Sequence, residues 1–255
     1  MDEMPPILEF DPTRQAVVEP SSVARPIGAP EHCVICFFRE VIEEVASAHS
    51  ARVIAEAGWE TGGPHPLYEI KHAGRRLAFF HPGVGAPVAG GLMEQAIAHG
   101  CRKFIACGGC GVLEPDVPVG QLVVVTAAVR DEGLSYHYLP AGREIIADAG
   151  AVRALEDTLR AQAVPFRSAK TWTTDAPFRE TRAKVAARRR EGCLTVEMEA
   201  SALMAVARFR GATFGQLLYA GDDLSGAEWD HRDWQSQPEV RARLFWLAAE
   251  ACLKL

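Results

Sequence analysis

The chain has 255 residues, 48% hydrophobic and 24% charged, so it can bury one substantial core and is neither a peptide module nor a disordered regulator. Its net charge is −6, from 27 lysines and arginines against 33 aspartates and glutamates, and no long run of like charges argues for a nucleic-acid or anionic-membrane surface. No apolar run approaches the roughly 18 residues of a membrane span, and the acidic, proline-rich N-terminus is unlike a signal peptide, so we expect a cytoplasmic protein.

Residues 1–31 are rich in proline and lack a clear periodicity, so we expect an extended arm that lies over the body or over a neighbouring subunit. After the arm, short apolar runs alternate with helix-like segments. The predicted strands are HCVICFF (32–38), a hairpin over 68–82 that turns at Ala73 and Gly74, KFIACGG (103–109), QLVVVTAAV (121–129), 167–172 and ATFGQLLYAGD (212–222). The predicted helices are 39–58 ended by Gly58, 87–99 capped by Gly100, 149–162, 178–191, one that begins near Met198, and 240–253. This alternation predicts one α/β domain over residues 32–255, with a central mixed β-sheet flanked by helices.

Seven cysteines in apolar contexts suit reduced thiols better than a disulfide framework. Cys33 and Cys36 have a CxxC spacing but lie on a predicted strand, whose period of two sends them to opposite faces, so we expect no metal there. Cys107 and Cys110 bracket two glycines in a predicted turn, where a thiol site is conceivable. We expect neither a metal nor an organic cofactor.

Ligands of α/β sheets bind beyond the carboxyl ends of the strands, so the segments that follow strands are the candidates for chemistry. In HPGVGAP (81–87), Gly83 and Gly85 allow close approach to a ligand, and the helix that follows offers free N–H groups, although a plain strand-to-helix turn explains the segment equally well. In CGGCG (107–111), Gly108 and Gly109 predict a second turn suited to an oxyanion or a sugar.

Two acidic segments complete the candidates. In TVEMEAS (195–201), Glu197 and Glu199 flank Met198 at the entrance to a helix; they suit a ribose, whose hydroxyls a carboxylate accepts, or simply complement the helix dipole. Asp222 and Asp223 end the strand LLYAG, and Asp222 is a candidate general acid or, alternatively, a helix or turn cap.

The order of six segments, HPGVGAP, FIACGGCG, GQLVVVTAAVRDEGLSYHYLP, TTDAPFRET, TVEMEASALMAVA and LLYAGDD, resembles the nucleoside phosphorylase superfamily of the hexameric purine and uridine type, which includes the nucleosidases. The resemblance extends from about residue 33 to the C-terminus. It implies a single α/β domain with a central mixed sheet, an active site at the strand ends, and assembly into a homo-oligomer, a dimer or a hexamer.

The resemblance also implies roles for individual residues. Glu199 would hold the ribose 2′ and 3′ hydroxyls, Met198 would pack on the sugar and Glu197 would support them. Phe178, in TTDAPF, would stack on the base. Asp222 falls where purine-specific members place the acid that protonates the base N7.

The departures from the family pattern concern the acceptor. Phosphorolytic relatives have an arginine where this chain has Ala106 and a hydroxyl residue where it has Gly109, and their Gly-Asp-Pro loop is absent here, which leaves Arg39 as the candidate phosphate arginine. Gly83 and Gly85 are the other candidate phosphate contacts. Glu40 falls roughly where the nucleosidases carry the glutamate that activates water, although a solvated helix residue explains it equally well.

Three functions therefore remain open from the sequence. A nucleoside phosphorylase is favoured narrowly by the family as a whole, whereas Ala106, Gly109 and Glu40 favour a nucleoside hydrolase. A non-catalytic nucleoside-binding or storage protein is disfavoured because it would not need both the ribose-binding acids and Asp222. The expected partners are a small nucleoside, with phosphate or water as acceptor, and further copies of the same chain.

Overall fold

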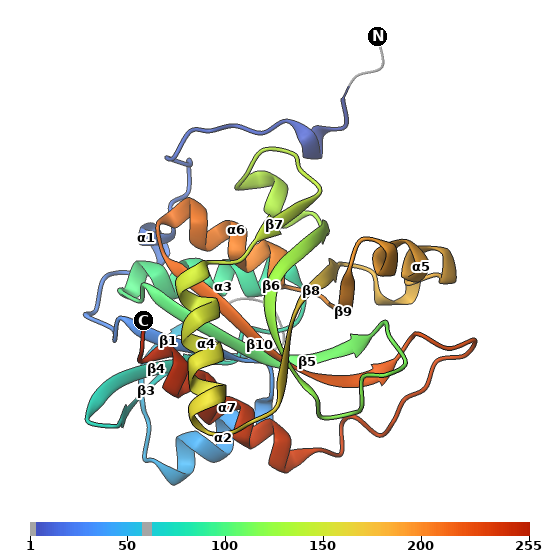
Figure 1. Ribbon diagram of the computed structural model, residues 1–255. Helices are drawn as coiled ribbons and strands as arrows, with labels where there is room; N and C mark the ends of the chain where they lie inside the picture. Colours follow the sequence, from blue (N-terminus) through green and yellow to red (C-terminus); the bar gives the residue numbers. More distant parts are fainter. Residues whose placement is uncertain (1–3, 58–62) are drawn as a thin grey trace.

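A computed structural model describes residues 4–57 and 63–255. Ten strands in these residues form one mixed sheet (Figure 1). They are β1 (His32–Cys36), β2 (Arg52–Ala57), β3 (His65–His72), β4 (Arg75–Phe80), β5 (Lys103–Val112), β6 (Leu122–Asp131), β7 (Glu144–Ile146), β8 (Phe166–Thr174), β9 (Cys193–Glu197) and β10 (Thr213–Asp223). The strand order is β10-β6-β8-β9-β5-β1-β4-β3-β2, with β7 beside β6. The predicted α/β class with a central mixed sheet is confirmed, whereas the division of the chain at residue 31 stays a prediction.

Helices cover both faces of the sheet (Figure 1). The helices are α1 (Pro20–Val23), α2 (Arg39–Ala48), α3 (Ala86–His99), α4 (Ala149–Ala161), α5 (Arg182–Arg190), α6 (Ala200–Arg210) and α7 (Pro238–Cys252), with 3₁₀ turns at Pro6–Leu8, Leu134–His137 and Pro177–Arg179. The apolar sides of α3 and α6 form one core cluster with the sheet. The apolar sides of α2, α4 and α7 form a second cluster on the opposite face. Alternate residues of β1 enter the two clusters, since Cys33 belongs to the first and Cys36 to the second.

The central strand β5 changes partners along its length. Its first half pairs with β1 as far as Cys107, opposite Cys36, and its last two residues pair with β9 from Gly111 onward. On its other edge β5 pairs with β10 throughout, so that β10, β6, β8, β9 and β5 close into a ring. Between Cys107 and Gly111, β5 therefore has no strand partner on the β1 and β9 edge among the described residues.

The predicted helix over residues 39–58 is wrong in its second half. The helix α2 ends at Ala48, Ser50 adopts a left-handed φ of 48°, and the chain reverses into β2. The segment RVIAEA prefers a strand because it pairs antiparallel with β3, a long-range contact that helix propensity does not include. Gly58, the predicted end of the helix, lies outside the described residues.

The predicted glycine turn at residues 107–111 is also wrong, because this segment belongs to β5. Gly108 and Gly109 continue the ladder with β10, opposite Leu218 and Tyr219. Neighbouring rings occupy the space of the missing side chains. A Cβ atom on Gly108 would lie 3.1 Å from Phe37, and one on Gly109 would lie 3.3 Å from both Trp234 and Tyr219.

The remaining differences concern where elements begin. The strand β9 was not predicted, and it carries the first glutamate of VEMEA, so that α6 begins only at Ala200. The charged helix α5 begins at Arg182, not near Phe178, because Thr181 caps it by accepting a hydrogen bond from the Lys184 N–H at 3.3 Å. The hairpin turn at Ala73 and Gly74 and the Gly100 cap of α3 are confirmed.

The N-terminal segment lies against the body of the protein. Arg14 stacks 4.6 Å above the ring of Phe209 in α6, and Glu19 forms an ion pair with Arg210 at 3.4 Å.

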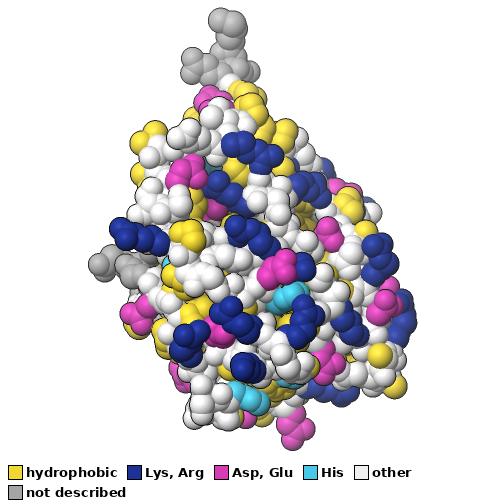
Figure 2. Space-filling model, turned by 90° about the vertical axis from the view of Figure 1, so that its left-hand side faces the viewer, with side chains coloured by type: hydrophobic (Ala, Val, Ile, Leu, Met, Phe, Trp, Pro, Cys, Tyr) yellow, Lys and Arg dark blue, Asp and Glu magenta, His cyan; other side chains and the backbone are white. Residues whose placement is uncertain are grey.

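The face of the molecule in Figure 2 carries Lys and Arg side chains interspersed with Asp and Glu, as is usual for a solvated surface. Within the described ranges, no helix combines the length and the apolar character needed to cross a bilayer.

All seven cysteines are buried and free. Burial raises the pKa of the thiols of Cys33, Cys107 and Cys110 well above its usual value, which disfavours the thiolate that a metal requires. Across residues 4–57 and 63–255, no group of three or more His, Cys, Asp or Glu side chains is arranged to hold a metal ion.

Candidate active site

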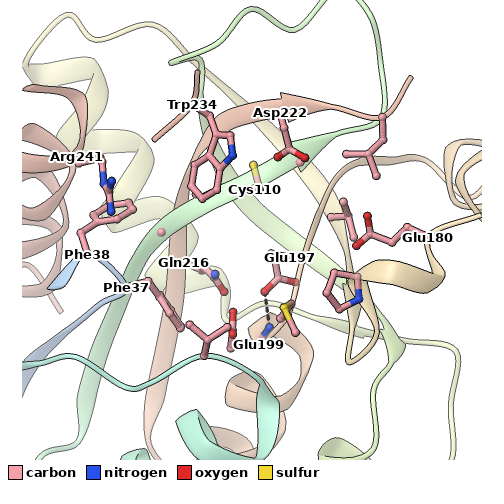
Figure 3. Close-up of a pocket in the computed structure, with 18 residues that line it drawn as sticks. Phe37, Phe38, Cys110, Glu180, Glu197, Glu199, Gln216, Asp222, Trp234 and Arg241 are labelled. Atoms are coloured by element: carbon pink, nitrogen blue, oxygen red, sulfur yellow. Dashed lines mark hydrogen bonds between the residues drawn. The ribbon is translucent and has the colours of Figure 1, made fainter. Parts of the chain in front are cut away.

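A cavity of about 300 Å³ opens beside the unpaired stretch of β5. Strands β1, β9 and β10 all end around it, so that it combines segments that are far apart in the sequence (Figure 3). The lining residues are Phe37, Phe38, Val84, Gly108, Gly109, Cys110, Gly111, Pro177, Glu180, Val196, Glu197, Met198, Glu199, Gln216, Asp222, Leu224, Trp234 and Arg241.

One end of the cavity holds the two glutamates at the junction of β9 and α6. Glu197 accepts hydrogen bonds from the backbone N–H groups of Glu199 and Ala200, both at 2.7 Å, and from the Thr173 hydroxyl at 2.6 Å. It therefore caps the N-terminus of α6 and is fixed in orientation. Glu199 accepts a hydrogen bond from the Gly85 N–H at 2.5 Å, and its carboxylate keeps acceptor capacity toward the cavity.

Burial makes the charged forms of these glutamates costly. It raises the pKa of Glu197 to about 7, against the opposing effect of the hydrogen bonds that it accepts. Burial and the neighbouring charge of Glu197 raise the pKa of Glu199 to about 8. Ionising both of these neighbouring buried carboxyls is therefore unfavourable. A ligand whose hydroxyl groups donate hydrogen bonds to them would compensate for their burial.

The opposite end of the cavity holds a second pair of acids, Asp222 and Glu180. The Trp229 indole N–H donates to the Asp222 carboxylate at 2.7 Å, which orients it. Burial and the charge of Asp222 raise the pKa of Glu180 to about 7. Asp223, the next residue in the sequence, forms an ion pair with Arg232. The pairing of β10 with β5 is irregular between Ala220 and Asp223, and the acid that interacts with Asp222 is Glu180.

Six of the predicted site residues line this one cavity: Gly108, Gly109, Glu197, Met198, Glu199 and Asp222. Phe178 does not, because the 3₁₀ turn at Pro177–Arg179 presents Pro177 to the cavity and leaves the Phe178 ring 99% exposed. Its ring borders a second hollow of about 490 Å³, shared with Trp229, that adjoins the cavity through Glu180 and Asp222.

The two candidates on α2 also lie outside the cavity lining. Arg39 and Glu40 occupy the first turn of α2, where both are exposed. Glu40 forms an ion pair with the Nε atom of Arg241 at 2.9 Å. Arg241 does line the cavity, and its guanidinium stacks 4.4 Å above the Phe38 ring.

Gly83 and Gly85 lie in the loop that precedes α3, with φ angles of 72° and 94° that favour glycine. Val84 between them lines the cavity. Because the Gly85 N–H already donates to Glu199, this loop helps to position the Glu199 carboxyl at its end of the cavity.

Six polar or aromatic side chains of the lining escaped the sequence analysis: Phe37, Phe38, Glu180, Gln216, Trp234 and Arg241. Glu180 lies two residues after Phe178, within the segment TTDAPFRET, and this neighbourhood was the available signal. Gln216 sits in an otherwise apolar strand, and a polar residue in such a run was also a signal. Trp234 and Arg241 lie beyond β10, and only the fold brings them to the cavity.

Comparison with known proteins identifies a family, sequence relatives and proteins of similar fold. Residues 31–253 match the profile of the Phosphorylase superfamily. The guanosine phosphorylase of Halorubrum lacusprofundi is 29% identical over 160 residues, which are 63% of this chain and 66% of that protein. The uridine phosphorylase of Thermococcus kodakarensis is 29% identical over 106 residues, 42% of this chain and 38% of that protein. The matched segments thus span less than two thirds of these relatives.

The fold has solved counterparts. The crystal structure of an AMP nucleosidase from Bacteroides thetaiotaomicron superposes with a TM-score of 0.71 at 18% identity, covering 88% of each chain. At that identity the likeness concerns the fold alone. The profile match, however, covers most of the sequence, including every segment that lines the cavity, and so this chain belongs to the phosphorylase superfamily.

Proposed function

We propose that this protein cleaves the N-glycosidic bond of a nucleoside, and that the base is a purine. The observation that carries the proposal is a single cavity with two buried glutamates at one end and a pair of acids at the other. The names of its relatives, a guanosine phosphorylase and a uridine phosphorylase, and of a fold neighbour, an AMP nucleosidase, support the same bond. A storage protein would not need the acids at the second end.

At the first end, Glu199 would accept hydrogen bonds from the ribose hydroxyls, because its carboxylate has free acceptor capacity. Met198 would pack on the sugar, and Glu197 would fix the geometry from the N-terminus of α6. Gly108 and Gly109 line the cavity beside β5, where they would border the sugar.

At the second end, Asp222 would give a proton to the departing base. Bond cleavage leaves the electron pair on the base nitrogen, and the sugar becomes oxocarbenium-like, so a proton donor near the base lowers the barrier. Glu180 titrates close to neutral pH and could supply Asp222 with that proton. A purine has an N7 atom that can receive it, which favours a purine over uridine. Phe178 would reach the base only if its exposed ring turned inward.

Two acceptors fit this chemistry. Phosphate is the acceptor that the names of the sequence relatives favour, with Arg39, Gly83 and Gly85 as the predicted contacts. Water is favoured by the lining, since Arg241 is the one cation among the described lining residues and is paired with Glu40. Glu40 itself would activate water only after leaving that ion pair.

The cellular setting is also a proposal. The absence of a membrane-spanning helix among the described residues and the mixed surface charge support a cytoplasmic enzyme without nucleic-acid or membrane partners. We also propose a homo-oligomer, either a dimer or a hexamer, as the family resemblance implies.

The test is base release from a panel of nucleosides. Purified protein is incubated with inosine, guanosine, adenosine and uridine, each with and without phosphate, and the free base is measured by chromatography. Release from at least one purine nucleoside is expected. If only uridine reacts, the base assignment is wrong, and if no nucleoside reacts, the proposed function is wrong.

A further inference from the structure

Gln216 is a buried polar residue whose hydrogen bonding is incomplete. It lies on β10, is 1% exposed and lines the cavity. Its side-chain carbonyl oxygen has no hydrogen-bond partner among the residues that the structure describes. A buried polar atom that lacks a partner destabilises the fold, so such a group is expected where a ligand provides the missing contact.

The place of Gln216 in the sheet limits which ligand atom it can meet. It is the register partner of Ala106 on β5, one step before the stretch of β5 that opens on the cavity. Figure 3 shows Gln216 on the side where Glu197 and Glu199 lie, away from Asp222. It therefore faces the sugar end and not the base end of the cavity.

The charges around Gln216 disfavour an anion. The described lining holds four carboxyl groups, those of Glu180, Glu197, Glu199 and Asp222, against the single guanidinium of Arg241. That guanidinium is shared with Glu40 and with the Phe38 ring. A phosphate brought to the sugar end would find no free cation there, whereas a neutral molecule would not need one.

The aromatic walls of the cavity also disfavour an anion. A Cβ atom on Gly108 would lie 3.1 Å from Phe37, and one on Gly109 would lie 3.3 Å from Trp234 and Tyr219, so these rings pack against the two glycines. Phe37 and Trp234 thus give this wall of the cavity an apolar character, which favours a neutral acceptor over an anion.

We propose that the side-chain amide of Gln216 binds the acceptor in this reaction, and that the acceptor is water. The inference rests on the proposed function. The carbonyl oxygen of Gln216 accepts a hydrogen bond from the water, which directs an oxygen lone pair at C1′. The bond from C1′ to the base nitrogen breaks with its electron pair on the base, which takes a proton from Asp222. The water oxygen bonds to C1′, keeps one hydrogen as the new hydroxyl group and releases the other as a proton to solvent. Asp222 regains its proton from solvent. The products are the free base and the free sugar.

The first experiment identifies the product. The full chain is incubated with the purine nucleoside that it cleaves best, with phosphate absent and then raised to millimolar concentration, and the sugar product is analysed. Free ribose at a rate that phosphate does not change is the expected result. Ribose 1-phosphate, or base release that requires phosphate, would overturn the inference while leaving the proposed glycosidic cleavage intact. No base release from any nucleoside would instead refute the proposed function itself.

The second experiment tests Gln216. Gln216→Met keeps the side-chain volume and removes the amide, so kcat should fall at least about tenfold with a smaller change in KM. Its thermal stability should not fall, because the substitution removes an unsatisfied buried group. Gln95→Met is the matched control, since Gln95 is a buried glutamine on α3 that borders a different, smaller hollow.

A third measurement separates acceptor binding from a structural role. Methanol added to the assay competes with water for the sugar, and the ratio of methyl riboside to ribose reports the acceptor site alone. Gln216→Met should change that ratio, and Gln95→Met should not. If Gln216→Met does not fold, Gln216→Asn, which retracts the amide by one methylene, provides the same readout. Unchanged kcat and an unchanged ratio in the folded variant would overturn the assignment of Gln216.

Discussion

Glu199→Gln should make the protein less active and, at alkaline pH, more stable. Glu199 is 6% exposed, and burial together with the charge of Glu197 raises its pKa to about 8 from an ordinary value of 4.5. The substituted glutamine retains a carbonyl oxygen that accepts the Gly85 N–H, so the local structure should persist. What the variant loses is the charge and one of the acceptors that we assign to the ribose hydroxyls.

The sign of the stability effect follows from proton binding. Between pH 4.5 and 8 the folded protein holds a proton on Glu199 that the unfolded chain releases, so the free energy of unfolding falls as pH rises through this window. The shift corresponds to a few kcal/mol, on the order of 1.4 kcal/mol for each pH unit, much of it shared with Glu197. The amide in the Glu199→Gln variant cannot titrate, and the stability of the variant relative to wild type should therefore increase from about pH 5 to about pH 9.

The assays are chemical denaturation at several pH values and steady-state kinetics of base release. We expect kcat/KM to fall at least about tenfold, because the amide keeps one carbonyl oxygen, which the Gly85 N–H occupies, and its NH2 group cannot accept from a ribose hydroxyl. Glu69→Gln is a control of opposite sign, because the side-chain hydrogen bond from Arg76 lowers the pKa of Glu69 to about 2. That stabilisation is present above pH 4.5 and is lost as pH falls toward 2, so this variant should be less stable than wild type at neutral pH but not in strong acid. Unchanged kinetics, or a pH profile of stability parallel to wild type, would refute the reasoning for Glu199.

Four further outcomes are expected. Asp222→Asn keeps an acceptor for the Trp229 indole and should fold normally while slowing base release about a hundredfold, the scale of a lost general acid; wild-type turnover would remove Asp222 from that role. Glu180→Gln removes a group that titrates near pH 7 and should flatten the pH dependence of kcat/KM around neutrality, which a pH series measures directly. Gly109→Ser places a Cβ atom 3.3 Å from Trp234 and should lower the free energy of unfolding by roughly 1–3 kcal/mol in denaturation experiments; an unchanged value would show that the ring yields without cost. Light scattering at micromolar concentration should give at least a dimer, and a 27.7 kDa monomer would contradict the proposed assembly.

The sequence predicted most of the fold because its strands are apolar runs and its helices have clear ends. It failed where a segment takes its structure from a distant partner. RVIAEA extends a helix-like pattern but pairs with β3, and CGGCG has the composition of a turn but continues the ladder with β10. Long-range pairing of this kind is not encoded in local propensity.

The candidate site was predicted in part for the same reason. The acids of VEMEA and GDD lie in short distinctive segments, and both segments reach the cavity. Phe178 was expected there too, but a 3₁₀ turn directs it outward and brings in Glu180 instead. Gln216 is a polar residue in an otherwise apolar strand, which is a signal that the sequence contains. Its role could not be predicted, because the sequence does not show which face of the sheet borders the cavity.

The unpaired stretch of β5 explains why these residues meet. Strand β1 stops at Cys36 because Phe37 donates the last ladder hydrogen bond to the Cys107 carbonyl and α2 begins two residues later. Strand β9 pairs antiparallel with the far end of the same edge of β5 and ends at Glu197, one residue past the partner of Gly111. The bulge near the end of β10 displaces Asp222 from the regular ladder beside them. Three strands thus end around one gap. Phe37 packs against Gly108, and Trp234 and Tyr219 pack against Gly109, so a side chain at either position would collide with these rings. The glycines at these positions are therefore required by close packing beside the cavity and not by a turn.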